Sequence, residues 1–391
     1  MLMIVNSTKW RRGIIAGVLL CAGPGVANAG ALTTLASFDT MNGASPFAGL
    51  IADAAGNLFG TTYQGGASSA GTVFEIANTG SGYGSVNTLA SFDGTNGAYP
   101  YAGLIADAAG NLFGTTVSGA SGPGTVFKIA KAGSGYGSVN TLASFNSTNG
   151  AYPEARLIAD AAGNLFGTTY AGGTSNYGSV FEIANTGSGY GSVNTLASFD
   201  GTNGANPYAG LIADAAGNLF GTTYGDGVSS TGTVFEIANT GSGYGSVNTL
   251  ASFNNTNGAY PEARLIADAA GNLFGTTYAG GTSNHGTVFE IANTGSGYGI
   301  VTALASFNTT NGAIPCAGLI ADAAGNLFGT TVGGGTSSAG TVFMLSDSGF
   351  VTSLATDVPE PQSLALLGAG LLALVMATRT NFRSSPKPRT I

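Results

Sequence analysis

One thirteen-residue segment, LIADAAGNLFGTT, occurs six times along this 391-residue chain. The copies are separated by 54, 53, 54, 54 and 54 residues, and they begin at Leu50, Leu104, Leu157, Leu211, Leu265 and Leu319. A constant period of about 50 residues is typical of repeat arrays, solenoids and propellers. The chain is therefore expected to fold as six similar units rather than as one irregular domain.

Each repeat predicts four short β-strands. In the first repeat these are GLIADAA, NLFGTTY, TVFEIAN and SVNTLASF, at residues 49–55, 57–63, 72–78 and 85–92. Helical periodicity is absent from the repeats. Four antiparallel strands in about 54 residues are typical of a propeller blade. We predict an all-β fold, a six-bladed β-propeller of four-stranded antiparallel blades, over residues 30–356.

Two segments compete for the strand that would close such a ring. LTTLASF, at residues 32–38, matches a fourth strand and precedes the first complete repeat. VTSLA, at residues 351–355, is a weaker match that follows the last repeat. The sequence leaves open which of the two joins the sixth blade.

The composition favours a packed, acidic body. Charged residues make up only 8% of the chain, but 43% of residues are hydrophobic and 21 are Phe, which argues for a core rather than disorder. Residues 30–357 contain 18 acidic and four basic residues, a net charge of −14. Such a body cannot neutralise a run of phosphates, so nucleic acid is not expected as a partner.

The N-terminal segment predicts export. Residues 1–29 contain a basic region, an apolar run at residues 13–22 and a small-residue cleavage site, Ala27-Asn28-Ala29. These are the three parts of a secretory signal peptide, which signal peptidase would remove. The apolar run is about half of the ~20 residues that a membrane span requires.

The C-terminal segment, residues 357–391, combines Val358-Pro359-Glu360-Pro361, an apolar stretch at residues 364–377 and a basic end. This arrangement resembles the PEP-CTERM sorting signal. The resemblance implies a hydrophobic sorting helix that holds the protein transiently in the inner membrane of a Gram-negative bacterium. It further implies processing by an exosortase near Pro359, Glu360 and Pro361, and delivery to the cell surface or the extracellular space. An ordinary C-terminal anchor is the alternative.

The repeat itself, GNLFGTTYxGGxxxxGTVFEI, resembles the GloVer-type tandem repeat of exported bacterial proteins. The resemblance covers about residues 31–356. In this family the repeat is found together with C-terminal anchoring signals, PEP-CTERM among them. The resemblance implies location and architecture, and it implies no activity.

The chain offers few groups for catalysis or metal binding. His285 is the only histidine, and the third repeat has Tyr177 in its place. Of two cysteines, Cys21 lies in the predicted signal peptide, which leaves Cys316 without a disulfide partner. The repeated aspartates are expected to form a turn from Asp53 to Gly56 in each repeat. We therefore predict no catalytic residue, no metal site and no cofactor.

The repeats differ from one another mainly in two loops, which an up-and-down blade places on one face. These are the loop between the second and third strands and the crossover to the next repeat. The crossovers of the third and fifth repeats also carry the pairs Glu154/Arg156 and Glu262/Arg264. Aromatic rings, amides and hydroxyls on fixed loops can bind polar ligands such as sugars. The predicted binding residues are Tyr99, Tyr101, Tyr170, Asn176, Tyr208, Tyr224, Tyr278 and Asn284. Sequence drift on exposed loops is the alternative explanation.

These features predict an exported, non-enzymatic protein of the cell surface or extracellular matrix. Polysaccharide binding through the varied loop face is its candidate activity, with exopolysaccharide as the candidate partner. One alternative is a propeller enzyme, a lactonase or a polysaccharide lyase, which requires a metal or an acid–base cluster at the mouth of the channel. The sequence gives no sign of an asymmetric acidic set there. The other alternative is a purely structural matrix protein.

Overall fold

The structure, a computed structural model, describes residues 33–119, 122–227 and 229–352. The chain divides into two compact units, Met1–Thr34 and Leu35–Ile391, and all strands belong to the second. The predicted signal peptide and sorting tail lie outside the described residues. Within the described ranges no helix is long and apolar enough to cross a membrane.

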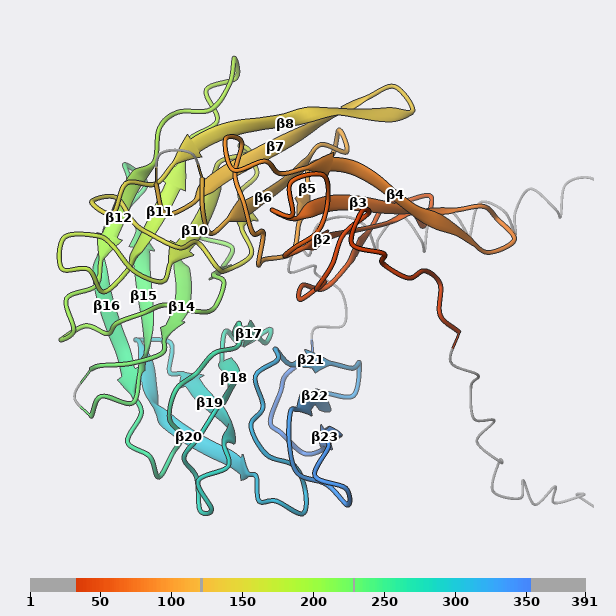
Figure 1. Ribbon diagram of the computed structural model, residues 1–391. Helices are drawn as coiled ribbons and strands as arrows, with labels where there is room; N and C mark the ends of the chain where they lie inside the picture. Colours follow the sequence, from red (N-terminus) through yellow and green to blue (C-terminus); the bar gives the residue numbers. More distant parts are fainter. Residues whose placement is uncertain (1–32, 120–121, 228, 353–391) are drawn as a thin grey trace, which may run out of the picture. The chain divides into compact units, whose positions relative to one another are not determined.

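The six repeats form six antiparallel sheets, the blades of a β-propeller (Figure 1). We number the blades one to six in chain order. Each sheet keeps its strands in sequence order, and five of the six have four strands. The sixth sheet has three strands among the described residues. The prediction of an all-β, six-bladed propeller of four-stranded antiparallel blades is confirmed, with this difference in blade six.

The first strand of each blade is only two residues long, shorter than predicted, because the Asp turn begins directly after it. In blade one the Asp53 N–H donates to the Asn57 carbonyl at 3.0 Å and the Gly56 N–H to the Asp53 carbonyl at 2.9 Å. The first strands are β1 (Ile51–Ala52), β5 (Ile105–Ala106), β9 (Ile158–Ala159), β13 (Ile212–Ala213), β17 (Ile266–Ala267) and β21 (Ile320–Ala321).

The second and third strands form the centre of each blade. In blade one they pair from Leu58↔Ile76 to Thr62↔Thr72, and the two threonine hydroxyls lie 2.8 Å apart. The second strands are β2 (Leu58–Thr62), β6 (Leu112–Thr116), β10 (Leu165–Thr169), β14 (Leu219–Thr223), β18 (Leu273–Thr277) and β22 (Leu327–Thr331). The third strands are β3 (Thr72–Asn78), β7 (Thr125–Ala132), β11 (Ser179–Ile183), β15 (Thr233–Asn239), β19 (Thr287–Asn293) and β23 (Thr341–Leu345).

The fourth strands lie at the outer edge of blades one to five. They are β4 (Tyr83–Ser91), β8 (Gly135–Ser144), β12 (Asn194–Ser198), β16 (Tyr244–Ser252) and β20 (Tyr298–Ser306). Each pairs with the third strand of its blade through a register shift, as between Val73 and Phe74 in blade one. Such a bulge increases the local twist of a strand.

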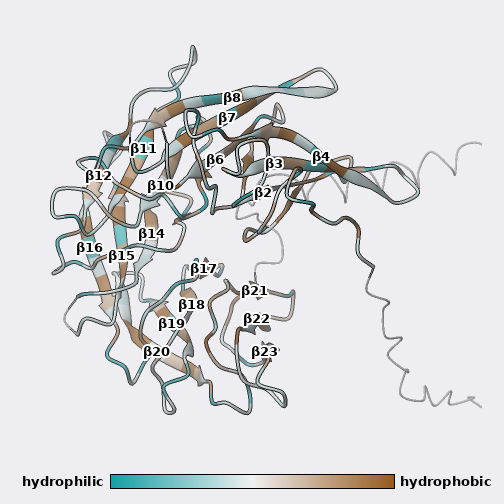
Figure 2. Cartoon of the chain, viewed as in Figure 1, coloured by the Kyte–Doolittle hydropathy of each residue, from teal (hydrophilic) through white to brown (hydrophobic). Residues whose placement is uncertain are grey.

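The core lies between the blades. At each junction of successive blades, rings and aliphatic side chains of one blade pack against the next, and Figure 2 shows the hydrophobic residues on the strands. At the first junction Val73 and Phe92 of blade one meet Leu104 and Phe127 of blade two, and each is fully buried. The third strands of blades one to five begin with residues buried on both faces, whereas β23 of blade six is partly exposed.

Candidate functional site

The two variable loops are joined to each other by backbone hydrogen bonds at the crossovers. Tyr99 has a left-handed backbone, with φ 61°, and its N–H donates to the Ala70 carbonyl of the preceding blade at 2.7 Å. Its own carbonyl accepts from Val117 of blade two at 3.2 Å. The equivalent positions share this positive φ: Ser45, Tyr152, Asn206, Tyr260 and Ile314. Few non-glycine residues adopt this conformation, so the surrounding hydrogen bonds must hold it in place. The crossover backbone is therefore rigid.

Two residues after that position, the crossovers carry side chains that meet near the propeller axis. The Tyr208 hydroxyl of blade four donates to the Tyr101 hydroxyl of blade two at 2.8 Å. Blades two and four are separated by blade three, so their side chains meet only where the blades converge, at the axis. We call this position the axial set, and its members are Phe47, Tyr101, Glu154, Tyr208, Glu262 and Cys316.

The axial set holds two carboxyl groups in a poorly solvated environment. Burial raises the pKa of Glu154 above its usual value. Burial also raises the pKa of Glu262, and a hydrogen bond from the Cys316 thiol opposes that effect. Tyr208 lies within the electrostatic reach of both carboxylates. The expectation that the channel mouth has no asymmetric acidic set is therefore wrong, because only blades three and five contribute glutamate.

The pKa values of Tyr208 and Cys316 in the axial set are raised, which favours their neutral forms. The pKa of Tyr208 is raised, first by burial, then by its bond to Tyr101 and the charges of Glu154 and Glu262. Burial raises the pKa of Cys316 to about 12, and Glu262 adds to the shift. At neutral pH these two groups are hydrogen-bond donors, whereas the carboxyls are the groups able to exchange protons.

Two buried threonines distinguish the blades that precede the glutamate crossovers. In blade one the Thr61 hydroxyl donates to the Ala102 carbonyl of the next crossover at 3.0 Å, and Thr168 bonds to Ala209 in the same way. The equivalent hydroxyls of Thr115 and Thr222 are at most 1% exposed and have no hydrogen-bond partner. Buried hydroxyls are nearly always bonded. Beside each of the two Glu-Ala-Arg crossovers, a buried threonine hydroxyl therefore lacks the hydrogen bond that its equivalent makes in other blades.

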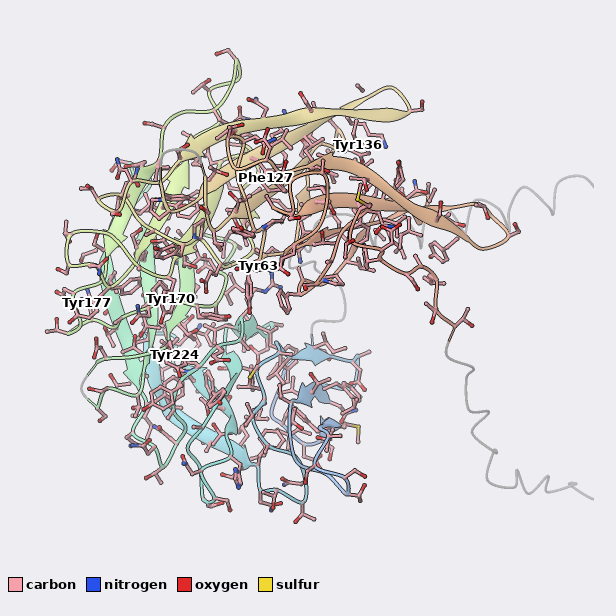
Figure 3. The ribbon with its side chains drawn as sticks, in the orientation of Figure 1. Tyr63, Phe127, Tyr136, Tyr170, Tyr177 and Tyr224 are labelled. Atoms are coloured by element: carbon pink, nitrogen blue, oxygen red, sulfur yellow. The ribbon has the colours of Figure 1, made fainter. Side chains whose placement is uncertain are left out.

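An aromatic cluster surrounds the axial set. Tyr101 packs against Tyr208 and Tyr63, and Tyr170 packs against Tyr208, each with ring centroids 6.2 Å apart. Tyr99 packs against Tyr63 at 5.2 Å. Figure 3 labels Tyr63, Tyr170 and Tyr224, which follow the second strands of blades one, three and four. The structure thus brings Tyr99, Tyr101, Tyr170 and Tyr208 of the predicted set together.

The other predicted binding residues have different surroundings. Tyr224 stacks on Tyr260, with centroids 5.0 Å apart. Asn176 and Asn284 cap their own loops, since their Oδ1 atoms accept from the N–H groups of Gly172 and Gly280 at 3.1 and 3.0 Å. Tyr278 is 36% exposed. The sequence analysis missed Tyr63 and Tyr260, although aligning the repeats would have placed both beside predicted tyrosines.

The repeated aspartates are structural, as expected. The Asp53 carboxylate accepts hydrogen bonds from the Ala55 and Asn57 N–H groups and from Asn57 Nδ2, at 2.8–3.0 Å. The other five aspartates accept the same three bonds. Within the described ranges, no group of three or more His, Cys, Asp or Glu residues could hold a metal ion.

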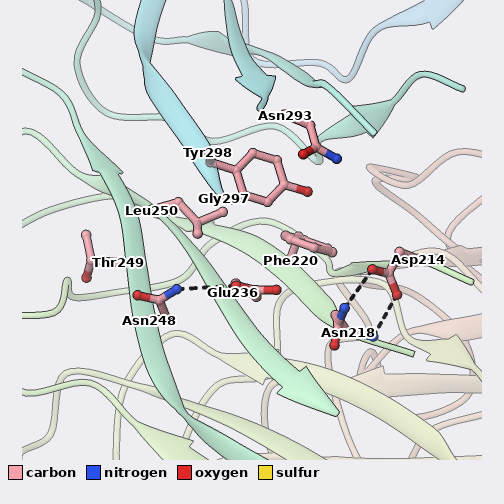
Figure 4. Close-up of a pocket in the computed structure, with 10 residues that line it drawn as sticks. All are labelled: Asp214, Asn218, Phe220, Glu236, Asn248, Thr249, Leu250, Asn293, Gly297 and Tyr298. Carbon is pink, nitrogen blue, oxygen red and sulfur yellow. Dashed lines mark hydrogen bonds between the residues drawn. The ribbon is translucent and has the colours of Figure 1, made fainter. Parts of the chain in front are cut away.

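A polar groove lies between blades four and five, with a volume of about 440 Å³ (Figure 4). Asn248 donates to the Glu236 carboxylate at 3.3 Å, and burial together with Glu236 and Asp214 raises the pKa of Tyr298 to about 12. Tyr136 has the same relation to Glu75 and Asp53 at the first junction. The relation of a tyrosine to two carboxylates thus recurs at other junctions, whereas the axial set is formed once, by all six crossovers.

The family of this protein can be identified from its repeat sequence. A family match covers residues 25–235 and, in a second alignment, residues 186–372. The chain belongs to the Gloeobacter/Verrucomicrobia repeat family. This confirms the GloVer-type resemblance. No curated protein matches this member of the family.

Several solved structures similar to this Gloeobacter/Verrucomicrobia repeat protein are propellers described by an enzyme activity. A gluconolactonase from Xanthomonas campestris is 14% identical, with a TM-score of 0.43 over 74% of this chain and 84% of its own. A putative 6-phosphogluconolactonase from Bacteroides uniformis is 11% identical, with a TM-score of 0.49 over 78% and 86%. A putative glucose dehydrogenase from Thermus thermophilus is 14% identical, with a TM-score of 0.45 over 77% and 96%.

These matches correct the prediction of a non-enzymatic surface or matrix protein. The activities named for these similar structures are enzymatic, and they are properties of those proteins. At 11–14% identity the likeness extends to the fold and transfers neither a substrate nor a residue to this Gloeobacter/Verrucomicrobia repeat protein.

Proposed function

We propose that the protein is a propeller enzyme that hydrolyses a lactone or a similar cyclic ester of a sugar at the axial set. The observation that supports this proposal is a pair of half-buried carboxyls, Glu154 and Glu262, whose charges both act on Tyr208 of the Tyr101–Tyr208 hydroxyl pair. Perturbed carboxyls cluster at functional sites because a proton-transfer group must have a pKa suited to its task.

The different surroundings of the two carboxyls assign their roles. The Cys316 thiol, whose Sγ donates to the Ile314 carbonyl at 3.7 Å, also opposes the rise in the pKa of Glu262, which suits Glu262 as the general base. Burial raises the pKa of Glu154, and no opposing hydrogen bond accompanies that shift, which suits Glu154 as the general acid. Pairs of carboxyls whose environments differ in this way carry out acid and base steps in one site.

The proposed reaction balances with water as the second substrate. Glu262 removes a proton from a water molecule, whose oxygen attacks the ester carbonyl carbon. The C–O bond of the ring then breaks, and Glu154 donates its proton to the departing oxygen. Because Tyr208 donates to Tyr101, the Tyr101 hydroxyl retains its proton for the developing negative charge on the carbonyl oxygen.

The test is the rate of acid release from a set of aldonolactones, beginning with glucono-1,5-lactone, measured above the spontaneous rate. We expect Glu154→Gln and Glu262→Gln each to lower kcat/KM by about 100-fold or more. The matched control is Glu182→Gln, which removes a carboxylate from the third strand of blade three. Absence of turnover on every lactone would overturn the proposal, as would equal rates for all three variants.

We also propose that this enzyme is exported and sorted. Residues 1–29 are the signal peptide that signal peptidase removes, and residues 357–391 are a PEP-CTERM tail that an exosortase recognises. The support is the order of motifs at each end of the chain. Intact mass of the secreted protein tests both, with a start at Gly30 and an end near Pro361 expected. A mass that includes either segment would contradict the corresponding half of the proposal.

A further inference from the structure

Blade six has an unpaired edge. Within residues 33–352, apart from the undescribed positions, β23 pairs with β22 on one side and with no strand on the other. The third strands of the other five blades all pair with a fourth strand. An open edge leaves backbone donors and acceptors without partners, and folded proteins generally cover such edges.

The side chains on both sides of the sixth junction are also exposed. Val342 of β23 is 80% exposed, whereas the equivalent Val288 of blade five is completely buried. In blade one, Leu50 is 50% exposed, whereas the equivalent Leu104 of blade two is buried. The side chains that form the core at five junctions thus lack cover at the sixth.

The chain just before blade one is already arranged like the end of a fourth strand. Phe38 packs edge-on against Phe74 at 5.0 Å and 71°. Phe92, the residue that follows β4, packs against Phe127 of the next blade at 5.0 Å and 66°. Each fourth-strand phenylalanine therefore contacts the following blade, and Phe38 makes that contact with blade one.

The turn that follows Phe38 gives independent support. Asp39 and Asn42 exchange backbone-to-side-chain bonds at 3.0 and 2.8 Å. Asp93 and Asn96 exchange the same bonds in the crossover from blade one to blade two, at 3.1 and 3.0 Å. The chain thus enters blade one through a crossover turn of the kind that elsewhere follows a fourth strand.

We propose that Leu35–Phe38 form the end of the fourth strand of blade six in the same chain, paired antiparallel with β23. The register follows from blade one, where Val73 lies opposite Ala90 in the sequence TLASF. The same TLASF sequence ends at Phe38, so Ala36 lies opposite Val342. The pairing covers the open edge and buries Val342 between blades six and one.

The other candidate strand, residues 351–355, fits this place less well. In its sequence Ala355 is followed by Thr356 and Asp357 rather than by Ser and Phe. It therefore has no phenylalanine for the contact with blade one, and Phe38 already occupies that place. A second copy of the chain would have to displace this resident segment.

Disulfide trapping tests the proposal, because opposed strand residues lie within the Cα separation that a disulfide spans. The variant carries Ala36→Cys and Val342→Cys, with Cys21→Ser and Cys316→Ser to remove other thiols. Val288→Cys with Ala305→Cys is the positive control, since these residues are opposed in blade five. We expect both pairs to form an intramolecular disulfide to a similar extent under mild oxidation.

Three results would overturn the proposal. The first is a disulfide in the control pair but not between residues 36 and 342. The second is a disulfide between Val342→Cys and Ala355→Cys, which would place the other segment on the edge. The third is a disulfide-linked dimer, which would place a second copy there.

A second measurement requires only one introduced cysteine. We expect the single thiol of Val342→Cys, in the same background, to react with a thiol reagent at least tenfold more slowly than Ser69→Cys on an exposed loop. Adding Leu35→Asp should restore fast labelling. Fast labelling without Leu35→Asp, in protein that is folded by circular dichroism, would refute the proposed strand.

Discussion

Every repeat contains one Asp turn and contributes one residue to the axial set, but only the residues of the axial set vary in type. The turn has the same sequence in every blade, and each of its side chains supports the backbone, as Asp53 does with three accepted bonds. The axial set follows an equally fixed backbone but carries four residue types on it. A repeat protein can therefore keep its fold constant while varying the side chains at one position.

The largest expected effect comes from removing both axial carboxyls. Glu154→Gln with Glu262→Gln should lower kcat/KM by at least about 100-fold, since general acid–base catalysis contributes about 10²–10⁴-fold. The melting temperature should not fall, because each change removes a half-buried carboxyl that partial burial makes costly to ionise. Steady-state kinetics and thermal unfolding of the same preparations measure both. A loss of activity that accompanies loss of folded protein would count against a catalytic role.

The opposite result is expected at the Asp turn. Asp160 accepts hydrogen bonds from the Ala162 and Asn164 N–H groups and from Asn164 Nδ2 at 2.8–3.0 Å. Asp160→Ala should lower the free energy of unfolding by about 1–3 kcal/mol, because backbone donors lose their acceptor. Its kcat/KM should stay within twofold of the wild type. Denaturant unfolding measures the first effect, and a fall in kcat/KM comparable to that of Glu154→Gln would erase the distinction.

The structure of a blade could be predicted from the sequence because each repeat contains the residues that form its internal contacts. The Asp turn and the Thr62–Thr72 pair are local, so one repeat predicts them. Tyr101 and Tyr208 were predicted as binding residues, but their contact was not, because they are 107 residues apart and meet only when non-adjacent blades converge. Aligning the crossovers would have shown glutamate in one column, but not that the column lies at the axis.

A smaller effect is expected from the hydroxyl bond across the axis. Tyr208→Phe removes the donor to Tyr101 while keeping the ring that packs against Tyr101 and Tyr170. The free energy of unfolding should fall by about 0.5–1.5 kcal/mol, the usual contribution of one hydrogen bond. We expect kcat/KM to fall by less than in Glu154→Gln. Tyr177→Phe, on an exposed ring, is the control, and equal effects of both changes would show that the bond does not matter.

The smallest effect is a pH dependence that the axial set imposes on stability. Burial raises the pKa of Glu154 in the folded protein above its ordinary value of 4.5. The folded state therefore holds this proton more tightly than the unfolded state does, and stability falls as pH rises between the two pKa values. Glu154→Gln has no proton to lose, so the wild type should lose stability relative to the variant above pH 4.5.

Comparing the wild type with Glu154→Gln isolates the contribution of the Glu154 carboxyl to stability. The aspartates of the turns titrate in both proteins, so their contributions cancel in the difference of unfolding free energies between pH 4 and pH 8. Glu262→Gln should give the same sign with a smaller size, because the Cys316 thiol stabilises the charged form of Glu262. Replacing that thiol in Cys316→Ala should then steepen the pH dependence that Glu262 contributes. Parallel curves for the wild type and Glu154→Gln would mean that Glu154 is solvated, and would remove the physical basis for its role as the acid.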